Sequence, residues 1–129
     1  MSKAPAYDDS DDMLYHVASA TLTSQAPKSL KLGPHTVTIN FQLSIFHLNQ
    51  EVNGIWNPNT MTISLNSQLA SKEATTTIFL HELLHAIYWF FGLKEKSKEE
   101  RVVDNLSTGL AMVYKDNPKL VAWINEGLR

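Results

Sequence analysis

The sequence predicts an α+β fold in which a small antiparallel or mixed sheet is followed by helices. In the first half of the chain, polar and apolar residues alternate over short stretches separated by turn signals, whereas the second half carries long helical patterns. Strands that precede helices favour this class over repeated β-α-β units. The 129 residues are enough for one modest hydrophobic core, so we expect a single domain.

Two stretches in the first half are typical of strands. Residues 36–43 follow a Gly-Pro turn signal at residues 33–34, alternate in polarity, and are rich in β-branched side chains. Residues 61–65 alternate again after an Asn-Pro-Asn turn at residues 57–60. The apolar residues 55–56 precede that turn, so we expect them to form a hairpin with residues 61–65.

Helix start and stop signals divide the second half. Ser71 is a candidate N-cap for a helix over residues 72–91, and Gly92 is its expected stop. A capping-box pattern at residues 97–100 opens a second helix, which is expected to run to about residue 115.

The two ends of the chain differ in character. Asn117 is expected to cap a last helix that begins at Pro118 and ends near Gly127. Residues 1–12 are acidic and predict a flexible tail, which leaves residues 13–129 as the folded domain.

Composition and charge exclude several function classes. The chain has a net charge of −2, so it lacks the basic excess expected of a nucleic-acid-binding protein. It has no cysteine, so disulfides, thiolate metal sites and cysteine nucleophiles are excluded. The longest mainly apolar stretch, residues 78–93, is interrupted by charged and polar residues and is short for a membrane span. No secretory signal precedes it, and we expect a cytoplasmic protein with no membrane or nucleic-acid partner.

The predicted helix over residues 78–91 carries the pattern His-Glu-Leu-Leu-His. Apolar residues occupy nearly every side of this helix, so we expect it to lie in the core. Burial of Glu82, His81 and His85 without hydrogen-bond partners would cost several kcal/mol of folding free energy. A bound metal ion would remove most of that cost. The alternative is a coincidence, in which two core histidines bond to carbonyl groups and the motif carries no chemistry.

The spacing of the motif matches a zinc-peptidase site. His81 and His85 are four residues apart, so they lie on one helix face and can bind one zinc ion (Zn2+) at about 2.0–2.1 Å. Glu82 lies about 100° further round the helix, where it can accept a proton from a metal-bound water without being a ligand. Two histidines leave zinc short of a ligand, because catalytic sites usually have three protein ligands and a water.

The third ligand is expected from the next helix. The metzincin continuation of the motif is excluded, because Tyr88 occupies its glycine position and Phe91 its last histidine position. Three carboxylates remain as candidates: Glu99, Glu100 and Asp104.

Helical periodicity separates these three carboxylates. Glu100 and Asp104 share a stripe with the small residues Ser107 and Ala111, which would let this helix pack close to the motif helix. In that arrangement Glu100 reaches the metal and Asp104 orients a ligand histidine. Glu99 projects toward the apolar face and stays the alternative ligand.

The motif and its surroundings resemble a known family. Residues 81–85 followed by Glu100 and Asp104 resemble the gluzincin branch of the zincin zinc metallopeptidases, and residues 54–65 are similar to small phage and prophage proteins of minimal zincin type. The resemblance covers about residues 33–120. It implies a minimal zincin fold with His81, His85 and Glu100 as metal ligands and Glu82 as general base.

The resemblance also implies a function. We expect a zinc metallopeptidase that cleaves a peptide or protein substrate, here a host or phage protein, in the host cytoplasm if the protein is phage-encoded. The alternative is a catalytically silent protein-binding module with the zincin fold. Zincin folds usually pair substrate with an edge strand, for which residues 61–65 are the candidate. No group that stabilises the transition state can be assigned among His16, His35, His47, Tyr88 and Tyr114.

Overall fold

The computed structural model describes residues 25–129, which form six strands and three helices. The predicted acidic tail at residues 1–12 lies outside this range. The elements, in chain order, are β1 (Ser29–Leu32), β2 (His35–Gln42), β3 (Ile45–His47), β4 (Gln50–Val52), β5 (Gly54–Asn57), β6 (Thr62–Asn66), α2 (Lys72–Phe90), α3 (Glu99–Asp116) and α4 (Pro118–Leu128). Strands precede helices, which confirms the predicted α+β class.

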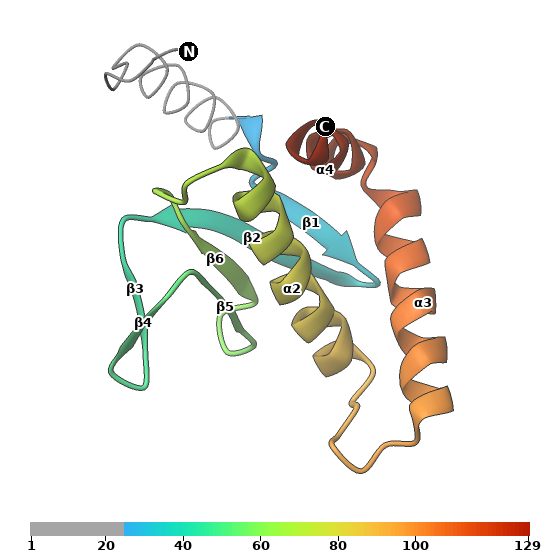
Figure 1. Ribbon diagram of the computed structural model, residues 1–129. Coiled ribbons are helices and arrows are strands. Elements are labelled where there is room, and N and C mark those ends of the chain that lie inside the picture. The colour runs from blue at the N-terminus through green and yellow to red at the C-terminus, as the bar shows by residue number, and fades with distance from the viewer. Residues whose placement is uncertain (1–24) are drawn as a thin grey trace, which may run out of the picture.

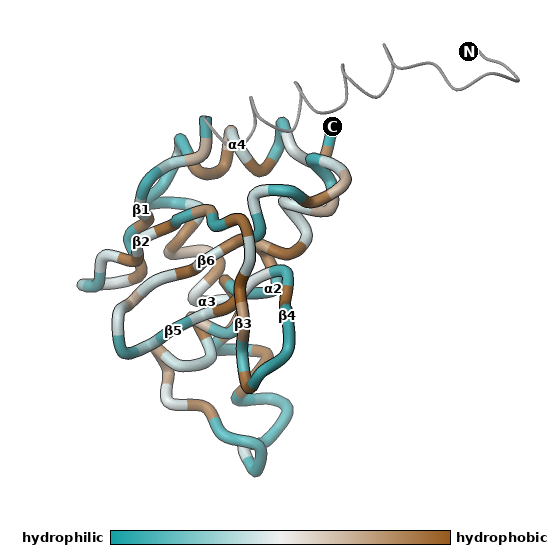
Figure 2. The backbone as a smooth tube through the Cα atoms, turned by 90° about the vertical axis from the view of Figure 1, so that its left-hand side faces the viewer, coloured by the Kyte–Doolittle hydropathy of each residue, from teal (hydrophilic) through white to brown (hydrophobic). Residues whose placement is uncertain are grey.

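A four-stranded mixed sheet with the order β1-β2-β6-β5 forms one layer of the fold, and the helices cover one of its faces (Figure 1). The strand predicted at residues 36–43 is β2, and the predicted hairpin is the antiparallel pair of β5 and β6. Among the described residues, strands β3 and β4 pair only with each other and form a separate two-stranded hairpin (Figure 2).

Strand β6 is not an edge strand, which corrects the expectation for residues 61–65. It pairs in parallel with β2 on one side and antiparallel with β5 on the other, so β5 forms the edge of the sheet. Alternation in polarity reports which face of a strand is buried but not how many neighbours the strand has. The parallel pairing of β6 with β2 is a long-range contact that no local pattern encodes.

Helix α2 packs along the sheet and begins and ends close to the predicted residues. The Ser71 hydroxyl accepts a hydrogen bond from the backbone N–H of Ala74 (2.9 Å), as an N-cap does. At the other end Gly92 has a φ of +62°, a conformation that glycine adopts without strain. The side chains of Phe79, Leu83 and other apolar residues of α2 are buried in the core, where the Phe79 ring meets that of Trp123 in α4.

Helix α3 contacts α2 through a glycine. A Cβ atom on Gly109 would lie 2.4 Å from Ile87 Cγ2 and 3.2 Å from a ring carbon of Phe91, so the two helices touch backbone to side chain. The predicted stripe of acidic and small residues does not make this contact. Its members are all exposed: Glu100, Asp104, Ser107 and Ala111. The smallest residue of α3 permits the closest approach, and it lies on a different face from that stripe.

We expect the substitution Gly109→Leu to lower the free energy of unfolding by about 1–3 kcal/mol, because the added side chain overpacks the α2–α3 contact. Urea unfolding followed by circular dichroism would measure this effect. Ala111→Leu, at an exposed position on the same helix, is the matched control and should change stability by less than about 0.5 kcal/mol. Equal midpoints for the two variants would contradict this packing.

The predicted capping box at Ser97 is wrong, whereas Asn117 stands at the N-cap position of α4, which begins at Pro118 as predicted. In both cases the side chain bonds elsewhere. The Ser97 hydroxyl accepts a hydrogen bond from the backbone N–H of Lys94 (2.9 Å), and α3 begins at Glu99 without a side-chain cap. The Asn117 side chain makes no cap bond to α4. It bonds both backbone groups of Lys31 in β1, accepting from the N–H (2.8 Å) and donating to the carbonyl (2.9 Å). Asn117 therefore ties the end of α3 to the sheet.

The described helices have no candidate membrane span. None of the helices within residues 25–129 is both long enough and apolar enough to cross a bilayer.

Candidate active site

Helix α2 presents His81 and His85 on its open side. Both imidazoles are exposed, and the His81 side chain keeps 65% of its accessible surface. Leu84, between them on the helix, is 39% exposed. The expectation that this helix is enclosed on nearly every side is therefore wrong. The sheet, α3 and α4 cover parts of the helix surface, and the apolar residues on the remaining side stay in contact with solvent.

The two histidines converge on one point. Their Nε2 atoms are 3.2 Å apart. Two ligands of one tetrahedral zinc ion, each about 2.05 Å from the metal, lie about 3.3 Å apart. The same separation suits a hydrogen bond in which one neutral imidazole donates its Nε2–H to the other. The separation of the pair therefore matches that of two ligands of one zinc ion.

Glu82 is the buried member of the motif. The residue is 8% exposed, and its Oε2 atom lies 4.0 Å from His81 Nε2. Within residues 25–129, that imidazole is the nearest potential cation and no hydrogen-bond donor reaches the carboxylate. Glu82 is therefore placed beside the histidine pair, on the covered side of α2.

Glu100 is not brought to the histidine pair. The α3 residue beside His81 and His85 is Leu106, which lines a small apolar pocket with them. Glu100 precedes Leu106 by six residues, which is about 9 Å along a helix axis. Across residues 25–129, no three His, Asp or Glu side chains are grouped so that they could hold one metal ion. Glu99 and Asp104 are exposed on α3 as well. The third ligand stays a prediction.

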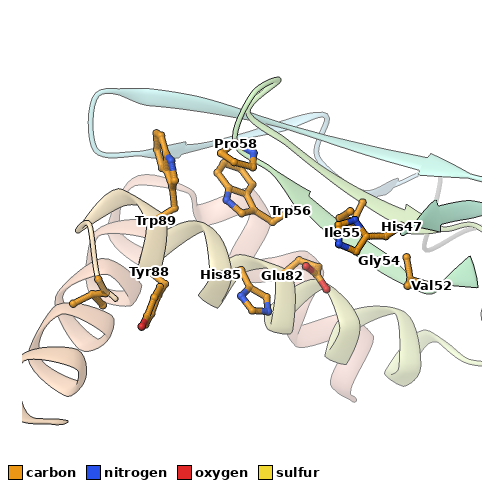
Figure 3. Close-up of a pocket in the computed structure, with 11 residues that line it drawn as sticks. His47, Val52, Gly54, Ile55, Trp56, Pro58, Glu82, His85, Tyr88 and Trp89 are labelled. Carbon is orange, nitrogen blue, oxygen red and sulfur yellow. The ribbon is translucent and has the colours of Figure 1, made fainter. Parts of the chain in front are cut away.

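A groove of about 510 Å³ runs between the edge strand β5 and helix α2. Glu82 and His85 lie in its middle (Figure 3). One end is aromatic and is formed by Trp56, Pro58 and Trp89. The other end is formed by residues of β3, β4 and β5: His47, Val52, Gly54 and Ile55. The candidate base therefore borders this groove between its two ends.

Strand β5 has main-chain hydrogen-bonding groups on its free edge that pair with no other strand. Asn66 N–H donates to the Asn53 carbonyl (2.8 Å), which makes Asn53 and Asn66 a hydrogen-bonded pair. Such pairs alternate along an antiparallel ladder, so Ile55 also bonds to β6, whereas the N–H and carbonyl groups of Gly54 and Trp56 point away from it. Within the described chain, neither residue makes a main-chain hydrogen bond outside the ladder.

Gly54 allows β5 to lie directly on the motif helix. A Cβ atom on Gly54 would lie 2.7 Å from Ile78 Cγ2 and 3.3 Å from Glu82 Cγ. Any side chain there would require β5 or Ile78 to shift, and it would crowd Glu82. The sequence signal for this contact is a glycine next to the apolar pair of residues 55–56.

The remaining histidines and tyrosines have separate locations. His35 packs against the rings of Trp89 (5.5 Å between centroids) and Phe90 (5.6 Å), so it belongs to an aromatic cluster. His47 and Tyr88 line the groove that holds Glu82. Tyr114 lines an apolar groove between α2 and α3 instead, and His16 lies outside the described residues. His47 was not recognised as a groove residue because the β3–β4 hairpin has no clear sequence signal.

Comparisons with known proteins add no relative. No protein-family model, curated protein or solved structure matches this chain.

Proposed function

We propose that this chain is a zinc-dependent metallopeptidase with Glu82 as general base and with His81, His85 and Glu100 as zinc ligands. The observation that carries the proposal is the convergence of two Nε2 atoms, 3.2 Å apart, next to a buried carboxylate. The substrate is a host or phage protein, and the site of action is the cytoplasm, that of the host if the protein is phage-encoded.

The chain's own residues divide the work of hydrolysis. A bound zinc ion supplies Lewis acidity, which lowers the pKa of water and polarises a carbonyl group. Glu82 takes up the proton released by the attacking water and passes it to the leaving amine. Strand β5 holds the substrate main chain extended beside Glu82 through the free groups of Gly54 and Trp56.

The third ligand rests on the resemblance rather than on a contact. Glu100 stands at the position that a gluzincin ligand occupies in sequence, and Glu99 is its alternative. Both are exposed at the beginning of α3, so either is free of competing interactions with the core.

Metal content tests the proposal directly. We expect about one zinc per chain by elemental mass spectrometry on tag-free protein, as in other catalytic zinc sites. His81→Ala should lose the metal, and Glu100→Ala should weaken its binding. Glu73→Ala, an exposed carboxylate in the first turn of the same helix as the histidines, is the control and should retain it.

Two other results would change the proposal. Zinc loss in Glu99→Ala instead of Glu100→Ala would move the third ligand and leave the peptidase function intact. If folded wild-type protein supplied with zinc binds none, the motif is a coincidence of sequence and the peptidase proposal fails.

A second function is favoured by the groove itself. A free strand edge beside an aromatic cleft binds extended peptides whether or not they are cut. A catalytically silent protein-binding module of zincin fold would therefore use the same surface. Zinc-loaded protein that binds peptides but cleaves none would support this alternative.

A further inference from the structure

We propose that the groove takes its peptide antiparallel to β5 and selects a large aromatic side chain at the second or third residue before the cleaved bond. This inference rests on the proposed function for the position of the cut, whereas aromatic selection by the groove is testable without cleavage.

The direction follows from the order of residues along β5. The strand begins at Gly54, beside Glu82, and runs toward Trp56, which lies beside Trp89. Antiparallel pairing is slightly more stable per residue than parallel pairing, because its hydrogen bonds are not slanted. A peptide added antiparallel to β5 has its N-terminal part at Trp56 and its C-terminal part at Gly54.

The register places one peptide side chain at the aromatic end. The peptide residue opposite Gly54 is the one nearest to Glu82, and it adjoins the bond to be cut. The residue opposite Trp56 precedes it by two positions, or about 7 Å of extended chain. Cross-strand partners share a face, so this side chain points to the same side of the sheet as Trp56, toward α2.

The surface that it meets is aromatic. The rings of Trp56 and Trp89 are 5.7 Å apart and tilted by 59°, and Pro58 and Tyr88 line the same groove. Trp89 keeps 39% of its surface exposed, which is a large uncovered area for an indole. An aromatic side chain in contact with these rings would remove apolar surface from water on both partners and allow edge-to-face contacts.

The opposite end of the groove offers no equivalent surface. Gly54 has no side chain, and the other residues there are Val52, Ile55 and the exposed His47, none of which carries a large aromatic ring. Selection is therefore expected before the cut and not after it.

Cleavage of a peptide library by the zinc-supplied full chain tests the position. Mass spectrometry of the products should show Phe, Tyr or Trp enriched about tenfold over Ala at the second or third residue before the cut. Trp89→Ala should bring that ratio close to one. Tyr114→Ala removes an exposed aromatic residue from a different groove and should leave the ratio unchanged.

Binding to the Glu82→Gln variant provides a second measurement. Titration calorimetry would compare a ten-residue peptide that contains one Phe with the same peptide in which Ala replaces it. We expect the Phe peptide to bind about tenfold more tightly, and we expect Trp89→Ala in the same background to abolish the difference.

The outcomes separate this inference from the proposed function. Cleavage that depends on Glu82 but shows no aromatic preference, or a preference after the cut, overturns the inference and leaves the peptidase intact. Tighter binding of the Phe peptide without any cleavage by the wild type supports the aromatic groove and contradicts the peptidase. Equal binding of both peptides, together with no cleavage, overturns both.

Discussion

Replacement of Glu82 by Gln is expected to lower peptide hydrolysis by about 10²–10⁴-fold, the usual contribution of a general acid–base residue. Gln has nearly the same shape as Glu, but its amide cannot accept the proton of the attacking water at neutral pH. Zinc should stay bound, because Glu82 is not among the proposed ligands. Turnover of a good library peptide and zinc content, measured on the same preparation, would check both parts.

The substitution Glu82→Gln should not lower the free energy of unfolding. Glu82 is 8% exposed, and no hydrogen-bond donor within residues 25–129 reaches its carboxylate, so Gln of nearly the same shape breaks no hydrogen bond of the folded chain. The urea midpoint of Glu82→Gln should be close to that of the wild type. Glu73→Gln, on the exposed first turn of α2, controls for the loss of one negative charge. Undiminished cleavage by Glu82→Gln would remove Glu82 from the mechanism.

The second large effect is expected at Gly54. The substitution Gly54→Ala should lower peptide turnover by about 100-fold, because a misplacement of about 1 Å in an active site can have that effect. The new Cβ atom would lie 2.7 Å from Ile78 Cγ2 and 3.3 Å from Glu82 Cγ, so the strand or Ile78 must shift and Glu82 is crowded. Backbone strain does not contribute, because Gly54 is not among the glycines with positive φ. Steady-state kinetics on one peptide would measure the change.

A compensating substitution distinguishes this steric effect from a general loss of folding. Ile78→Ala removes the atom in closest conflict, so Gly54→Ala combined with Ile78→Ala should recover most of the lost turnover. Zinc content should be unchanged in all three variants, because neither residue is a proposed ligand. A double variant no more active than Gly54→Ala would contradict the assigned contact between β5 and α2.

Local signals predicted the elements that depend on neighbours in sequence. The Ser71 cap, the Gly92 stop and the β5–β6 hairpin all formed close to the predicted residues, because each is decided by side chains within a few positions of one another. The capping box at Ser97 did not form, and Asn117 stands at its predicted N-cap position without a side-chain cap bond, because both side chains have other partners. For Asn117 the competing partner is the backbone of Lys31, which lies far away in sequence and is brought near only by folding.

In the candidate site, too, the sequence predicted what depends on local spacing and not what depends on tertiary packing. Helical spacing alone places His81 and His85 on one face of α2, and their Nε2 atoms meet at 3.2 Å as that spacing predicts. The sequence could not tell which side of the helix would be covered. Packing against the sheet and the other helices buries Glu82 and leaves both imidazoles exposed.

The sequence by itself determined the α+β order of elements, the motif helix and the pairing of its histidines, because these follow from periodicity and from short-range hydrogen bonds. Only the tertiary structure decided that β5 is the edge strand and that Gly54 brings it against Glu82. It also decided that Gly109, and not the acidic stripe, faces α2. These features depend on which surfaces meet across distant parts of the chain, and the free energy of such contacts is absent from any local pattern.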